Sequence, residues 1–177
     1  LSLITKALNR MSDLVAKILE IKVLESSSLK TNYTNVDLKQ ITEQVIAALK
    51  IQSDNKNIQI TTDLDEVVAS LDRSLMIQII DNLLSNAIKF SDHNTIVHIT
   101  LKEENQTLRL VIDDEGPGIK EQDKAQLFKK FGKLSARPTY GESSTGLGLS
   151  IVKKYVEVMN GKVWCESEYG QGAKFIV

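Results

Sequence analysis

The stretch DNLLSNAIKF, Asp81 to Phe90, places two amides and one cation at helical spacing inside a strongly apolar segment. At about 100° of turn per residue, Asn82, Asn86 and Lys89 fall within roughly a 60° stripe of a helix. Apolar residues occupy the other side and are predicted to face the core: Met76, Ile77, Ile80, Leu83, Leu84, Ala87 and Ile88. Amide oxygens suit Mg²⁺ and a lysine suits phosphate, so the stripe is a candidate site for both, with a solvated helix face as the alternative.

The composition is that of an ordinary soluble globular protein. The chain has 177 residues, 42% hydrophobic and 25% charged, with a formal net charge of −1. It lacks a basic tract that would attract nucleic acid and an apolar run that would span a bilayer, so we expect neither contact. A single cysteine, Cys165, excludes disulfide scaffolds and cysteine-based zinc sites. We expect a cytoplasmic piece of a longer protein, and leave open whether that parent is membrane-anchored.

The N-terminal residues 1–28 have the pattern of one long helix with a coiled-coil seam. Its apolar residues alternate spacings of three and four: Leu1, Ile4, Leu8, Met11, Val15 and Ile18. Three serines, Ser26 to Ser28, then mark a joint or a helix end. A seam this regular favours a separate dimerising or hinge helix over simple packing on the domain. We therefore expect two parts, residues 1–28 and residues 29–177.

The larger part alternates helix and strand patterns. Asp37, with Gln40 three residues on, predicts the start of a helix that runs to about Asn55, and Asp72 is expected to cap the helix containing Asp81 to Phe90. Strands are predicted over residues 58–62, 67–71, 95–102, 107–113, 162–168 and 173–177, and a last helix over residues 147–159. Residues 119–145 lack regular periodicity, which is typical of a functional lid. The prediction is a two-layer α/β (α+β) sandwich, with a mixed, mostly antiparallel sheet covered on one face by helices and preceded by the long N-terminal helix.

Two glycine-rich segments do not fit the familiar phosphate loops. Residues 141–146 have P-loop spacing, but Leu147 stands where that loop needs a lysine. Gly146-Leu147-Gly148 opens a helix, but Ile151 stands at the third glycine position of a dinucleotide fingerprint. What remains is a helix N-terminus that offers N–H groups to an anion. In Asp114 to Gly118, a carboxylate closes a strand, and it would accept a hydrogen bond from an exocyclic amine such as that of adenine.

Taken together and in this order, these segments resemble the ATP-binding catalytic domain of sensor histidine kinases, in the superfamily shared with gyrase, the Hsp90 chaperones and mismatch-repair ATPases. The four matching motifs are the N box at residues 81–90, the first glycine box at 114–119, the F box at 127–131 and the second glycine box at 146–149. The likeness extends over about residues 31–177. Residues 1–28 look like the second helix of the family's dimerisation hairpin.

The resemblance implies a role for each matching position. Asn86 would hold Mg²⁺, and Asn82 would assist in that shell or at the phosphates. The nucleotide would also be bound by Lys89, Phe90, Asp114, Gly116, Gly118, Ile119, Lys133, Thr145, Gly146, Leu147, Gly148 and Leu149. Asp114 would bond the adenine amine, while Phe128 and Phe131 would anchor the lid. The alternatives are a core position for Phe90 and Ile119, and a solvated one for Lys133.

The resemblance further implies ATP and Mg²⁺ as cofactors and transfer of the γ-phosphate to a histidine. Hydrolases and serine-directed kinases of the superfamily have a glutamate where this chain has Asn82. Because an amide cannot serve as a general base, transfer to a histidine is favoured over hydrolysis.

The acceptor histidine itself is expected elsewhere. Neither His93 nor His98 matches the acceptor context, so we expect it upstream of Leu1 and expect no autophosphorylation by this chain alone. The implied partners are the acceptor hairpin, a response regulator and a second copy of the parent. The alternatives are a nucleotide-sensing module without transfer and an ATPase of the same superfamily.

Overall fold

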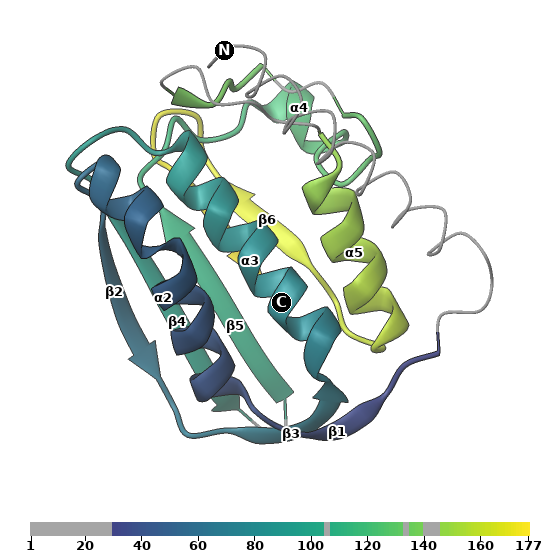
Figure 1. Ribbon diagram of the computed structural model, residues 1–177. Helices are drawn as coiled ribbons and strands as arrows, with labels where there is room; N and C mark the ends of the chain where they lie inside the picture. The colour runs from purple at the N-terminus through teal and green to yellow at the C-terminus, as the bar shows by residue number, and fades with distance from the viewer. Residues whose placement is uncertain (1–29, 105–106, 133–134, 140–145) are drawn as a thin grey trace, which may run out of the picture. The chain divides into compact units, whose positions relative to one another are not determined.

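The computed structural model describes residues 30–104, 107–132, 135–139 and 146–177, and the chain divides into two units, Leu1–Thr31 and Asn32–Val177. The helix predicted over residues 1–28 lies outside the described residues. Within the second unit, three helices cover one face of a sheet: α2 (Leu38–Asn55), α3 (Arg73–Phe90) and α5 (Gly148–Val158) (Figure 1). A single helical turn, α4 (Glu121–Lys124), lies between the first glycine box and the F box. The two-layer arrangement predicted from the sequence is confirmed.

The main sheet has five strands in the order β2-β4-β5-β7-β6. The strands are β2 (Gln59–Leu64), β4 (Ile96–Glu104), β5 (Thr107–Asp114), β7 (Ala173–Ile176) and β6 (Trp164–Ser167). β2 pairs with β4 in parallel, and the other neighbours pair antiparallel. The predicted mixed and mostly antiparallel sheet is therefore confirmed.

A second sheet, an antiparallel ribbon of β1 (Tyr33–Asp37) and β3 (Val68–Asp72), was not predicted. It ends on the two residues that start the first two helices. The Asp37 carboxylate accepts a hydrogen bond from the Gln40 amide at 2.9 Å, and that of Asp72 accepts from the amides at the start of α3. Both predicted N-caps are confirmed, and the ribbon places the two helix starts relative to each other.

The core lies between the helices and the sheet, with α3 at its centre. Five α3 side chains are completely buried: Ile79, Ile80, Leu83, Leu84 and Ile88. The helix packs against β5, whose inward Ile112 is completely buried, as is Ile99 on β4. Burying one such side chain contributes about 1.5–3 kcal/mol, so α3 is a rigid support for the polar stripe on its remaining face. Ile77, predicted as core, is only half-buried.

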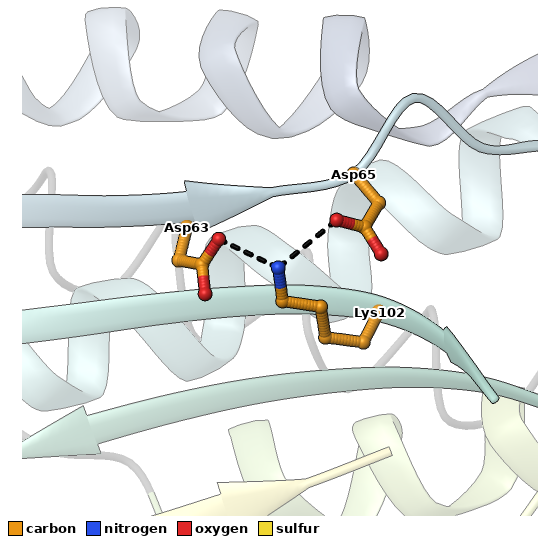
Figure 2. Close-up of polar contacts among 3 residues, drawn as sticks. All are labelled: Asp63, Asp65 and Lys102. Carbon is orange, nitrogen blue, oxygen red and sulfur yellow. Dashed lines mark hydrogen bonds and ion pairs between the residues drawn. The ribbon is translucent and has the colours of Figure 1, made fainter.

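The outer face of the sheet is polar. The Nζ of Lys102 on β4 donates to the carboxylates of Asp63 and Asp65, at 2.6 Å and 2.9 Å (Figure 2). These two carboxylates raise the pKa of the Lys102 amine. The Arg109 guanidinium lies 5.6 Å from the centre of the Trp164 ring on the same sheet. None of the described helices is both long enough and apolar enough to cross a membrane.

Candidate functional site

One cavity collects residues from several of the predicted motifs. It lies where the end of α3, the end of β5 and the start of α5 come together. Its lining includes six of the predicted site residues: Asn86, Phe90, Asp114, Gly118, Ile119 and Leu149. The N box, the first glycine box and the second glycine box, which are far apart in the sequence, therefore contribute to the same small volume.

Five further residues line the cavity and were absent from the predicted set: Pro117, Leu127, Ala136, Ala173 and Phe175. The last two come from β7, where Ala173 is paired with Asp114 and Phe175 with Ile112. Strand alternation alone places them on one face of β7, but only the pairing register shows that this face borders the cavity. Leu127 is the first residue of the F box, and it is 6% exposed.

Asp114 is the one carboxylate in an otherwise mainly apolar lining. Its side chain is 7% exposed, and its Oδ1 accepts a hydrogen bond from the Gly116 amide at 2.9 Å. Burial raises the pKa of this carboxyl to about 6, against the opposing effect of the Gly116 and Ala173 amides. At neutral pH the group is still mostly ionised, so it is a strong hydrogen-bond acceptor in an apolar wall. Such a wall suits a flat heteroaromatic ring that carries an amine.

The first glycine box is fixed by the turn that joins β6 and β7. Gly118 has a φ of +66°, and a Cβ there would overlap the carbonyl oxygen of Glu168, so the backbone requires glycine. The Ile119 amide donates to the Ser167 hydroxyl at 2.9 Å, and the Gly170 amide donates to the Pro117 carbonyl at 2.8 Å. The end of β6 and the following turn therefore hold the cavity wall around Asp114 at two points.

The amides of the N box meet the start of α5. The Nδ2 of Asn82 donates to the Gln78 carbonyl at 2.8 Å, while its Oδ1 lies 2.8 Å from the position that a Cβ on Gly148 would occupy. Asn86 approaches the same point to 3.8 Å. The α5 helix begins without a side-chain cap, and its first N–H groups suit an anion. Leu147 is completely buried, so its side chain belongs to the core.

The F box is joined to the second glycine box by backbone atoms. The Phe131 amide donates to the Gly146 carbonyl at 3.1 Å. The Phe131 side chain is 59% exposed and Phe128 is half-buried, whereas Leu127 is 6% exposed. The anchoring role of the two phenylalanines stays a prediction. The Lys89 side chain is half-buried near the end of α3. Lys133 and Thr145 lie outside the described residues, and their predicted roles stay predictions.

Known proteins are similar to this chain in sequence. Residues 71–177 match the family described as histidine kinase-, DNA gyrase B-, and HSP90-like ATPase. The sensor-like histidine kinase SenX3 of Mycobacterium tuberculosis is 30% identical over 168 residues, which cover 94% of this chain and 41% of SenX3. The chain thus spans less than half the length of this relative.

Solved structures share the fold. The full-length protein ShkA in complex with AMPPNP has a TM-score of 0.83 at 26% identity, covering 97% of this chain and 36% of ShkA. The histidine kinase ThkA, solved in complex with the response regulator protein TrrA, has a TM-score of 0.78 at 28% identity. That likeness covers 98% of this chain and 48% of ThkA.

Proposed function

The chain belongs to the family of histidine kinase-, DNA gyrase B- and HSP90-like ATPases, and from that premise we propose that it is the ATP-binding catalytic region of a sensor histidine kinase. The parent protein would transfer the ATP γ-phosphate to a histidine outside this chain, for relay to a response regulator. The observation that carries the proposal is the single buried carboxylate of Asp114 in the apolar cavity. It supplies the acceptor that the amine of adenine requires.

The remaining lining fits the rest of an adenosine. Phe90, Ile119 and Leu149 are apolar walls for the faces of a ring. The phosphates would then lie towards the start of α5, where Gly146, Leu147 and Gly148 offer backbone atoms. Lys89, and from the lid Lys133 and Thr145, would add phosphate contacts.

Mg²⁺ fits the amide end of the cavity. Asn86 borders the cavity, and the Oδ1 of Asn82 lies beside Gly148, so side-chain amides are available at the end where phosphates would enter. We propose Asn86 as the metal ligand, with Asn82 in a supporting position. When bound, the ion neutralises charge that develops on the transferred phosphoryl group.

The acceptor is proposed to be a histidine of a dimeric hairpin in the parent protein. His98 lies on the outer face of β4, away from the cavity, and its Nδ1 is 2.7 Å from the hydroxyl of Thr61 on β2. ThkA was solved in complex with a response regulator protein, which supports a receiver domain as the second partner. We place this region in the cytoplasm, where ATP and such partners are available.

The test is a transfer reaction. The chain is mixed with radiolabelled ATP, Mg²⁺ and the histidine-bearing hairpin of the parent protein, and we expect label on the hairpin. A hairpin whose histidine is replaced by alanine is the control and should stay unlabelled. If nucleotide binds but no label is transferred to the hairpin, the histidine kinase hypothesis fails. Release of phosphate at the same rate without hairpin would indicate an ATPase instead.

The nucleotide site has its own test in Asp114→Asn. We expect the variant to bind ATP at least about tenfold more weakly, about 1.4 kcal/mol, because the charge-assisted bond to adenine is lost. Isothermal titration with AMPPNP measures the dissociation constant. An unchanged value would remove Asp114 from the nucleotide site.

A further inference from the structure

A buried lysine joins the ends of two helices next to the cavity. Lys56, which follows α2, is only 4% exposed. Its Nζ donates to the carbonyl oxygens of Ile88 and Lys89 at 2.8 Å and 3.1 Å, and to the Thr139 hydroxyl at 2.8 Å. These three acceptor oxygens belong to residues that lie 32, 33 and 83 positions away in the sequence.

The two carbonyls belong to the last turn of α3. The last four carbonyls of a helix have no partner within it. Here the Ser91 amide donates to the Ala87 carbonyl at 3.0 Å, and the Lys56 Nζ donates to the two carbonyls that follow, those of Ile88 and Lys89. The positive charge also lies at the negative end of the α3 dipole, which favours its placement there. Lys56 thus satisfies two carbonyls of the last turn of α3.

Thr139 brings the lid to the same point. Its hydroxyl accepts from Lys56 and lies 3.1 Å from the Lys89 carbonyl and 3.0 Å from the Ser91 carbonyl, to which it donates. At the other end of this short segment, the Ser135 amide donates to the Asp123 carboxylate at 2.8 Å. Residues 135–139 are therefore fastened at both ends.

This arrangement couples two walls of the cavity. Phe90, at the end of α3, and Ala136, between the two fastened residues, both line the cavity. The Phe90 carbonyl also lies 3.3 Å from the position that a Cβ on Gly116 would occupy, beside the first glycine box. A shift of the α3 end would therefore move Phe90 against Gly116 and loosen Ala136 at the same time.

We infer that Lys56 is a positioning residue for nucleotide binding, which holds the end of α3 and residues 135–139 in register through Thr139. Lys56 is not among the residues that line the cavity, so it acts through Phe90 and Ala136 rather than on the nucleotide. The inference rests on the proposed function of the cavity. A contact outside the cavity would then control the affinity for the nucleotide.

The test compares Lys56→Met, Thr139→Val and the double variant. Met keeps most of the length and Val keeps the shape, so each variant mainly removes hydrogen bonds. The dissociation constant of Mg²⁺–AMPPNP is expected to rise by about tenfold in Lys56→Met and by about threefold in Thr139→Val. Because both residues belong to one contact, the double variant should bind no more weakly than Lys56→Met alone. Additive losses would overturn the inference.

The matched control is Lys50→Met on α2, the helix that Lys56 follows. Its side chain is 70% exposed and pairs with Asp54 at 3.0 Å, so its loss should leave the dissociation constant within about twofold. If Lys56 had only a structural role, Lys56→Met would lower the melting temperature but leave the nucleotide affinity of the folded protein unchanged. That result would also overturn the inference. If Lys56→Met does not fold, Thr139→Val decides the question in the same titration.

Hydrogen exchange separates this inference from the proposed function. Without nucleotide, backbone amides of residues 135–139 and 88–91 should exchange faster in Lys56→Met and Thr139→Val than in the unaltered chain and in Lys50→Met. If the unaltered chain bound no nucleotide, the proposed function would fail while this measurement still tested the contact. Equal exchange rates in all four proteins would refute the inference about Lys56 and Thr139.

Discussion

Asp114→Asn should make the nucleotide-free chain more stable, although we expect it to weaken nucleotide binding. The carboxyl is 7% exposed, and burial raises its pKa from 3.8 to about 6. Between pH 3.8 and about pH 6, the folded state therefore binds more protons at this carboxyl than the unfolded state does. The free energy of unfolding therefore falls as pH rises through about 6, and the loss is complete above it. Asparagine removes the charge and keeps an acceptor oxygen for the Gly116 amide.

The size of the change in the free energy of unfolding follows from the pKa shift of Asp114. A change of about 2 pKa units corresponds to about 3 kcal/mol between the two protonation states. Between about pH 5 and about pH 8, this group alone should remove about 1.4 kcal/mol from the stability of the unaltered chain, because the folded carboxyl is mostly protonated only at the lower pH. Allowing about 1 kcal/mol for the weaker neutral hydrogen bond, Asp114→Asn should be about 2 kcal/mol more stable near pH 8. That advantage should shrink towards pH 5.

Urea unfolding followed by circular dichroism measures this difference. Both proteins are unfolded at each pH, without nucleotide and at one ionic strength, with equal m-values as the check on the unfolding reaction. Asp54→Asn is the control: its side chain is 58% exposed, and its stability should stay within about 0.5 kcal/mol of the unaltered chain at both pH values. A variant less stable than the unaltered chain near pH 8, or a gap that does not narrow in acid, would refute the reasoning.

Two further predictions concern the same wall of the cavity. Gly118→Ala should lower the free energy of unfolding by more than about 3 kcal/mol, because its Cβ would overlap the Glu168 carbonyl; Gly170→Ala, also at positive φ but with open space around it, should cost about 1–2 kcal/mol in the same urea experiment. AMPPNP affinity should fall by up to about tenfold as pH drops from about 7 to about 5, because Asp114 loses its charge. Calorimetry at both pH values should show no such dependence in Asp114→Asn, and a similar fall there would contradict this explanation.

Much of the fold could be predicted because its signals are local. The caps at Asp37 and Asp72 each depend on a side chain and amides two or three residues away, so the sequence alone contains both partners. The apolar side of α3 follows from helical spacing in the same way. The motif order, read through the family resemblance, then named six of the residues that the structure gathers at the cavity.

What was missed depends on pairing between distant segments. The β1–β3 ribbon joins Tyr33 to Asp72, and residues 33–37 alone show only an extended stretch. Phe175 borders the cavity because of its register with β5. Lys56 follows a helix as an ordinary charged residue, and nothing near it in the sequence indicates that its partners lie more than thirty residues away.

Position 82 shows how the structure limits the chemistry of the site. An amide can donate, and the Nδ2 of Asn82 does so to the Gln78 carbonyl. An ionised carboxylate only accepts, so an aspartate in the same orientation would place its oxygen against that carbonyl oxygen and lose the bond. The amide is therefore matched to its own helix, and its Oδ1 faces Gly148 at the start of α5. A group held this way can orient phosphate or metal but cannot take a proton from water. The proposed reaction then requires a nucleophile that needs no such base, which is what an imidazole near neutral pH provides.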